Sequence, residues 1–300
     1  STLANMVIGV ATPMVAYVVV DGKTVMSGSR MTIIAGVFSI CAILCYIVCF
    51  KLTRERVEVP ASSQKVSASA IFKSIFTNRA LLGIIVAAIF VLLSQLTVMS
   101  LAGYVYPNVY GSAAAQSTAS LLGTVVMLIV CAPFASKLAA KFGKKELAVA
   151  SSICSALVWL VCLIWRPASV WGFVACYILA NIGMGFFNTI IWAMITDVID
   201  DAEVRSGIRE DGTIYSVYSF ARKLGQAFSS GLVGALLGII GYTEATAFDP
   251  TVTRGIFNMA CIAPIIGFVC IVLALVFLYP LSKKKVEENV AALAARRNSK

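Results

Sequence analysis

The stretch Asp197-Val-Ile-Asp-Asp-Ala-Glu-Val-Arg-Ser-Gly-Ile-Arg-Glu-Asp-Gly212 is unusual because ten of its sixteen residues are charged or glycine. It lies between two apolar segments, 169 to 196 and 213 to 240, that are each long enough to cross a bilayer. The second segment carries Arg222 and Lys223 well inside its length. Charge at that depth in a membrane is costly, so we expect functional residues in this region.

The composition around this stretch is typical of a membrane protein. Of the 300 residues, 60% are hydrophobic and 13% are charged, and the mean hydropathy is +0.92. Soluble domains carry roughly 25% charged residues. Apolar runs near the ~20 residues that span a bilayer predict an all-α polytopic membrane protein. The predicted spans are about 2 to 20, 31 to 50, 80 to 104, 113 to 134, 147 to 165, 169 to 196, 213 to 240 and 255 to 280.

The distribution of basic residues predicts the orientation of these spans. Eighteen Lys and Arg residues lie on one side, in the loops at 51 to 79, 137 to 145 and 205 to 209 and in the tail after 282. Four lie on the other side. The positive-inside rule therefore places both ends of the chain in the cytoplasm. Topology explains the net charge of +10, so no nucleic-acid partner is expected.

Several functional classes are disfavoured. The chain has nine cysteines, all in apolar runs and without a CxxC pair, and it has no histidine, so no metal site is predicted. It lacks a Walker or Rossmann glycine motif and a Ser/His/Asp set, so we do not expect an enzyme or a bound cofactor. The chain opens on Ser1 near the start of an apolar run, without a signal peptide, and is interpreted as a piece of a longer protein.

Two loops allow more than one interpretation, and the tail allows one. The tyrosines of Gly103-Tyr-Val-Tyr-Pro-Asn-Val-Tyr-Gly111 either anchor a helix at the outer interface or line the outer mouth of a substrate path. Ser136 to Lys145 is either a basic stop loop or a degenerate copy of the loop between paired helices in major facilitator transporters. The tail from Lys283 to Arg297 is predicted to be a basic amphipathic segment at the inner membrane surface.

The span from 169 carries a polar stripe. At about 100° per residue, Asn181, Gly185, Asn188 and Trp192 fall within about 60° of one another. The stripe is either a helix-packing surface, with Gly183 and Gly185 allowing close approach, or a cavity wall. In a cavity, the amides would bind sugar hydroxyls and Trp192 would stack on a pyranose face.

The next span has a similar polar face, which contains Tyr215, Ser219, Arg222, Gln226 and Ser230, with Lys223 at its edge. Lys223 lies about ten residues in, or ~15 Å deep, close to the midplane. It forms either a structural ion pair or part of the transport path. The acidic residues of the intervening stretch are either a solvated charge run or a latch that forms in one conformation, with nearby arginines compensating the helix dipole.

Three segments together resemble a known family signature: Trp192-Ala-Met-Ile-Thr-Asp-Val-Ile-Asp-Asp-Ala-Glu203, Ser206-Gly-Ile-Arg-Glu-Asp-Gly212 and Tyr218-Ser-Phe-Ala-Arg-Lys-Leu-Gly225. They resemble the glycoside-pentoside-hexuronide:cation symporters, which include melibiose, β-glucuronide and xyloside carriers. Span count and loop placement extend the resemblance over the whole chain. Asp201 departs from the aromatic residue that is common there, and Asn188 departs from the tryptophan of the melibiose branch.

The resemblance implies a twelve-helix major facilitator fold, of which this chain would be helices five to twelve with the N-terminal part missing. Residues 1 to 50 would be the last two helices of the N-terminal bundle, and 51 to 79 the cytoplasmic central loop. Residues 80 to 282 would form the six-helix C-terminal bundle, and 283 to 300 a basic cytoplasmic tail. In the family, the residues that bind the coupling cation lie mainly on early helices, which are absent here.

We therefore predict cation-coupled symport of a sugar or glycoside, including glucuronides, across the inner membrane by alternating access. The coupling ion would be Na⁺ or H⁺, and the full-length protein a monomer. The predicted substrate-binding residues are Asn181, Asn188, Trp192, Tyr215, Lys223 and Gln226. The predicted cytoplasmic latch consists of Asp197, Asp200, Glu203, Arg209 and Arg222. The alternatives are a major facilitator carrier of a lipid or drug, and a non-transporting scaffold or sensor.

Overall fold

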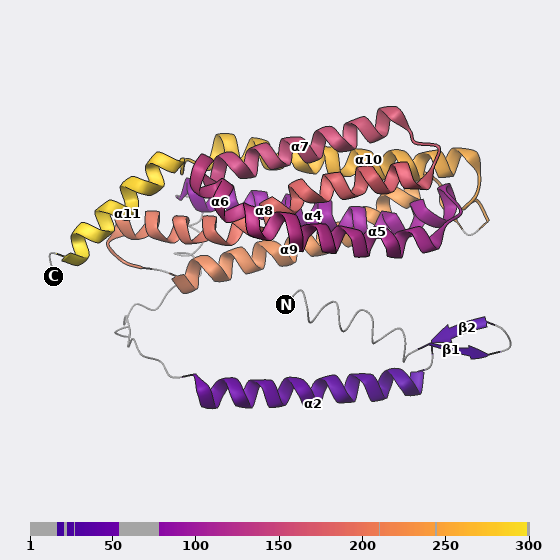
Figure 1. Cartoon of the computed structure of the whole chain (residues 1–300), viewed down its shortest axis with the longest axis horizontal. Helices are drawn as coiled ribbons and strands as arrows, with labels where there is room; N and C mark the ends of the chain where they lie inside the picture. The colour runs from indigo at the N-terminus through magenta and orange to yellow at the C-terminus, as the bar shows by residue number, and fades with distance from the viewer. Residues whose placement is uncertain are drawn as a thin grey trace. The chain divides into compact units, whose positions relative to one another are not determined.

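The computed structural model describes residues 17–20, 23–26, 28–53, 78–209, 211–243 and 245–298. The chain divides into two compact units, Ser1–Lys65 and Val66–Lys300. Figure 1 shows their secondary-structure elements in chain order. The predicted domain boundaries within 51 to 79 fall largely on residues outside the described ranges, and they remain predictions.

The first unit contains a β-hairpin and one long helix. Strand β1 (Tyr17–Val20) pairs antiparallel with β2 (Lys23–Met26), so that Tyr17 lies opposite Met26. The prediction of a helical span over 2 to 20 is wrong at its end, where a Tyr-Val-Val-Val run of high β propensity forms the strand. Residues 1 to 16 lie outside the described ranges. Helix α2 (Gly28–Leu52) confirms the predicted span at 31 to 50.

The second unit is a bundle of long helices followed by a shorter helix (Figure 1). Three of its helices change locally to π-helix, labelled η. In chain order the elements are α4 (Arg79–Tyr104), η1 (Val105–Val109), α5 (Ala113–Val126), η2 (Met127–Cys131), α6 (Ala132–Phe142), α7 (Lys144–Trp165), α8 (Val170–Ser206), α9 (Asp211–Ile239), α10 (Pro250–Leu273), η3 (Ala274–Leu278) and α11 (Lys283–Asn298).

Within the described ranges, six helices are long and apolar enough to cross a membrane: α2, α4 with η1, α5 with η2 and α6, α7, α8, and α10 with η3. Helix α9 is not among them, yet it packs along α4. A Cβ atom added at Gly225 of α9 would lie 2.9 Å from the carbonyl oxygen of Ile89, so glycine permits this approach. The chain is a multi-pass membrane protein, as its composition predicts.

Small residues also bring the other helices together. Gly183 of α8 lies against Ser151 and Ser155 of α7, and the Ser155 hydroxyl donates to the Ala180 carbonyl at 2.8 Å. Close approach at Gly183 confirms the helix-packing role predicted for this glycine. The polar stripe of α8 lies on a different face of the helix from the one that packs on α7.

One end of the bundle, called here the aromatic end, holds η1 and the connections after α7 and α9. Phe173 lies at its centre, within 6.0 Å of the Tyr106, Tyr110, Trp159 and Phe257 rings measured between centroids. Tyr106 is 1% exposed, and Tyr110 donates to the Pro167 carbonyl at 3.0 Å. These two tyrosines therefore belong to the bundle core rather than to a membrane-interface anchor.

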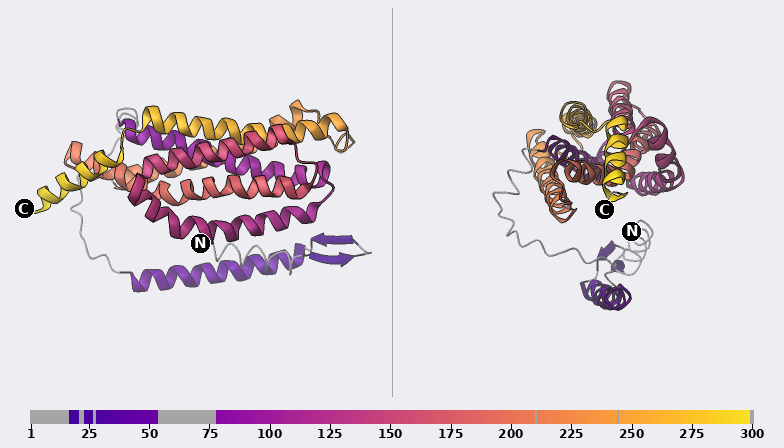
Figure 2. Two further views of the ribbon diagram at one scale, coloured as in Figure 1. Left: turned by 45° about the horizontal axis from the view of Figure 1, so that its top comes forward. Right: turned by 90° about the vertical axis from the view of Figure 1, so that its left-hand side faces the viewer.

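The opposite end, called here the charged end, holds the α6–α7 turn, the α8–α9 connection and the start of α11 (Figure 2). Helix α8 continues to Ser206, so most of the stretch predicted as a polar loop is helical. The helix ends at Gly207, whose φ of 76° suits glycine. The acidic side chains of its last turns have basic partners, which offsets their unfavourable interaction with the helix dipole.

Candidate functional site

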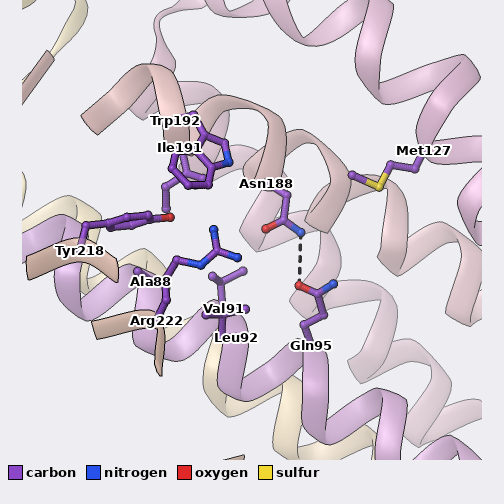
Figure 3. Close-up of a pocket in the computed structure, with 10 residues that line it drawn as sticks. All are labelled: Ala88, Val91, Leu92, Gln95, Met127, Asn188, Ile191, Trp192, Tyr218 and Arg222. Atoms are coloured by element: carbon purple, nitrogen blue, oxygen red, sulfur yellow. Dashed lines mark hydrogen bonds between the residues drawn. The ribbon is translucent and has the colours of Figure 1, made fainter. Parts of the chain in front are cut away.

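A cavity of about 230 Å³ lies between α4, α8 and α9, at the polar stripe of α8 (Figure 3). Its polar and aromatic lining comes from three helices, whereas η2 contributes one methionine. The lining residues are Ala88, Val91, Leu92, Gln95, Met127, Asn188, Ile191, Trp192, Tyr218 and Arg222. We refer to this cavity as the polar pocket.

Two amides face each other across the polar pocket. The Asn188 Nδ2 atom donates to Gln95 Oε1 at 3.4 Å, which joins α8 to α4 (Figure 3). Both amides retain further donors and acceptors for a ligand. Sequence reasoning did not select Gln95, although a lone amide in the apolar run Phe90-Val-Leu-Leu-Ser-Gln95 is the same signal that selected Asn188.

Arg222 points into the same pocket beside two aromatic rings (Figure 3). Its guanidinium carbon lies 5.3 Å from the Trp192 ring centroid and 5.8 Å from that of Tyr218. The two rings meet edge to face at 5.5 Å. These distances suit cation–π contacts. In the described part of the chain, no carboxylate forms an ion pair with Arg222.

Four of the predicted substrate residues lie outside the polar pocket. Lys223 is exposed and donates to Gln226 Oε1 at 3.2 Å, so these two residues form a pair of their own. Asn181 donates to the Tyr177 carbonyl of its own helix at 2.7 Å, and Tyr215 is 37% exposed. The structure thus groups Asn188 and Trp192 with Arg222, which was predicted to belong to the latch, and not with Lys223.

The charged end separates the other latch residues into two groups. Asp197, 5% exposed, pairs with Lys144 at the start of α7, with 2.6 Å between Nζ and Oδ1. Its second carboxylate oxygen is buried without a hydrogen-bond partner among the described residues. Asp197 therefore joins α8 to α7 and is not in contact with Arg209.

The second group, called here the Arg209 cluster, joins α8 to α9. The Arg209 guanidinium contacts Glu203 at 2.8 Å and Asp200 and Asp211 at 2.9 Å each. The hydrogen bonds that Arg209 donates to these carboxylates, that to Glu203 foremost, raise the pKa of Arg209, so it stays charged. The structure brings together three of the predicted latch residues and adds Asp211, which sequence reasoning assigned to no site.

No group of three or more His, Cys, Asp or Glu side chains within the described ranges is placed to hold a metal ion. The polar pocket instead offers hydrogen-bonding amides, an indole 49% exposed and one cation. These are groups that bind a polar organic solute. A helical membrane bundle with such a pocket between its helices has the features of a carrier.

The chain belongs to the MFS/sugar transport protein family, whose model matches residues 1–283. It is similar to the glucuronide carrier protein homolog of Escherichia coli, with 28% identity over 264 residues, covering 87% of this chain and 56% of the relative. The uncharacterized symporter YjmB of Bacillus subtilis is 29% identical over 266 residues, covering 87% and 57%. A putative sulfoquinovose importer of Salmonella typhimurium is 27% identical over 270 residues, covering 89% and 56%.

These matches confirm the resemblance to the glycoside-pentoside-hexuronide:cation symporters and the all-α major facilitator fold class. The relatives are named as a carrier, a symporter and an importer, in agreement with the prediction that the chain is not an enzyme. The chain spans about half the length of the curated relatives it matches, at 56% and 57%.

Proposed function

We propose that this chain is part of a carrier that moves a sugar or glycoside across the cytoplasmic membrane, coupled to Na⁺ or H⁺. The observation that carries the proposal is the polar pocket, where Asn188 and Gln95 offer amides beside the Trp192 indole. Sugar hydroxyls both donate and accept hydrogen bonds, and an indole packs against a pyranose face. A lipid or an apolar drug would leave these amides without partners.

Arg222 favours an acidic sugar over a neutral one. Its charge faces two rings rather than a carboxylate in the described chain. A sugar carboxylate or sulfonate supplies the missing counter-charge and accepts hydrogen bonds from the planar guanidinium. The names of two relatives, a glucuronide carrier protein homolog and a putative sulfoquinovose importer, refer to acidic sugars and support this choice.

The proposed transport cycle is alternating access, with the charged end in the cytoplasm. The Arg209 cluster bridges α8 and α9 at this end, so its separation would accompany opening. The side chains in its ion pairs are 19% to 48% exposed, and ion pairs that solvent reaches contribute about 0–1 kcal/mol each, which suits a contact that forms and breaks. We propose that the coupling cation binds mainly outside the residues of this chain.

Uptake of a labelled glucuronide and a neutral glycoside by cells with the full-length protein tests the proposal. We expect Asn188→Ala and Trp192→Ala to reduce uptake of at least one solute by tenfold or more. Asn108→Ala is the matched control, because Asn108 lies at the aromatic end and donates to the Tyr242 hydroxyl. Wild-type uptake by both pocket variants would contradict the assignment.

A further inference from the structure

The helix after the last span, α11, is docked on the end of α8 and is not a detached amphipathic tail. Its inward face follows helical spacing: Asn289 is 3% exposed and Leu293 5% exposed, whereas Lys284 and Lys285 on other faces are exposed. At its start, the Lys283 ammonium donates to the Lys141 carbonyl at 3.1 Å. The helix is therefore held both at the α6–α7 turn and along α8.

The centre of this contact is a buried polar pair. Asn289 Nδ2 donates to Asp201 Oδ1 at 3.0 Å, and Asp201 is 1% exposed. The other carboxylate oxygen lies 2.7 Å from the Arg205 guanidinium, in ion-pair contact that lacks hydrogen-bond geometry. A buried carboxylate that loses a partner bears an uncompensated desolvation cost. Docking of α11 is thus linked to the burial of a charged side chain of α8.

The far end of α11 contacts the backbone of α8. The Arg296 guanidinium donates to the carbonyls of Glu203 and Val204 at 3.2 and 2.9 Å. These carbonyls belong to the last turn of α8, and that of Glu203 also accepts the Gly207 N–H at 2.9 Å. A cation at this position also interacts favourably with the helix dipole.

The same last turns of α8 carry the Arg209 cluster. Asp200 and Glu203 hold Arg209, while their neighbours Asp201 and Val204 contact α11. The Arg209 ion pairs are partly exposed and individually weak. The contacts of α11 include a buried pair and a buried leucine, which are stronger constraints on the backbone.

We propose that α11 is a conformational clamp: docked through Asp201 and Asn289, it keeps the last turns of α8 helical and the Arg209 cluster assembled. Release of α11 loosens the charged end and changes the rate at which it opens. The link to transport rate rests on the proposed function, whereas the structural coupling between α11 and residues 200–209 does not. The mechanism needs no ligand, because the constraint comes from within the chain.

The test uses amide hydrogen exchange on the purified full-length protein. Asn289→Asp places a second carboxylate against Asp201, so we expect at least fivefold faster exchange in α11 and in residues 200–209 at neutral pH. The swapped double variant, Asp201→Asn with Asn289→Asp, restores one amide and one carboxylate and should restore protection of both segments from hydrogen exchange. Lys284→Ala, on an exposed face of α11, is the control.

Faster exchange confined to α11, with residues 200–209 unchanged, would overturn the clamp. Failure of the swapped double variant to restore protection from hydrogen exchange would also overturn the clamp. Counterflow of a labelled glucuronide in proteoliposomes provides the second measurement. We expect Asn289→Asp to change the counterflow rate at least twofold. The swapped double variant should return the rate to that of the wild-type protein. Altered exchange with unaltered counterflow would refute control of transport. Absence of counterflow in the wild-type protein would instead refute the proposed function, independently of the exchange result.

Discussion

At the scale of single residues, two adjacent cations on α9 have different surroundings. Arg222 lies in the polar pocket and Lys223 is exposed beside Gln226. The rotation of α9 explains the difference. Gly225 faces α4, and at about 100° per residue Arg222 lies about 60° from that face, whereas Lys223 lies about 160° away. Sequence periodicity alone gives the angle between the two side chains but not which one faces the pocket.

The first prediction concerns Arg222. Arg222→Gln should weaken binding of an acidic sugar by roughly 10- to 100-fold, because a hydrogen bond to a charged group contributes about 1.5–3 kcal/mol. Binding of the neutral analogue should change less than threefold, since it makes no use of the guanidinium charge. Isothermal titration of the full-length protein with both sugars measures the difference. An equal loss for both sugars would show that Arg222 supports the pocket rather than selects the substrate.

The second prediction concerns Lys144 and Asp197. Lys144→Ala leaves a carboxylate that is 5% exposed without its ion-pair partner, so it should destabilise the protein by about 3–5 kcal/mol. Adding Asp197→Asn removes the charge and should recover a large part of that loss. Thermal unfolding in detergent compares the variants, with Lys141→Ala as a control at an exposed site of the same turn. A double variant no more stable than Lys144→Ala would contradict the pairing.

At the scale of elements, hydropathy predicts the position of the helices because burial in a bilayer is a local property of the sequence. It does not predict where helices end. Residues 197 to 206 are helical because their acidic side chains form ion pairs or hydrogen bonds with Lys144, Arg205, Arg209 and α11. Three of these four partners lie outside α8. Sequence reasoning grouped Asp197 with Asp200, Glu203 and Arg209, and spacing along the sequence gave no sign that Asp197 pairs with Lys144 of α7 instead.

The third prediction tests the contact between α4 and α9. Gly225→Ala places a Cβ atom 2.9 Å from the backbone oxygen of Ile89, which cannot move independently of α4, so we expect a loss of about 1–3 kcal/mol. Gly231→Ala on the same helix meets no described atom within 4 Å and should be neutral or stabilising through helix propensity. Thermal unfolding of the two variants measures the difference. Equal stability would mean that α9 does not approach α4 at Gly225.

At the scale of the whole molecule, the chain combines features that the sequence specifies locally with features that packing decides. Of the seven spans predicted from 31 onward, six correspond to helices long and apolar enough to cross a membrane, and the exception is 213 to 240, which is α9. The polar stripe of α8 led to Asn188 and Trp192. Gln95 and Tyr218 entered the polar pocket only through helix packing, because each lies on a different helix from that stripe. The short hairpin of β1 and β2 was missed because an apolar run of β-branched residues suits a strand as well as a span.

The fourth prediction is the orientation of the bundle. The excess of Lys and Arg at the charged end places it in the cytoplasm and the aromatic end outside. Arg254 and Lys285 are exposed near the aromatic and charged ends respectively, so single cysteines at these positions report the two sides. In a full-length protein without its native cysteines, Arg254→Cys should react with an impermeant maleimide in intact cells. Lys285→Cys should react only after permeabilisation, because the membrane blocks the reagent. The reverse labelling pattern would show the opposite topology, with the Arg209 cluster and α11 outside the cell.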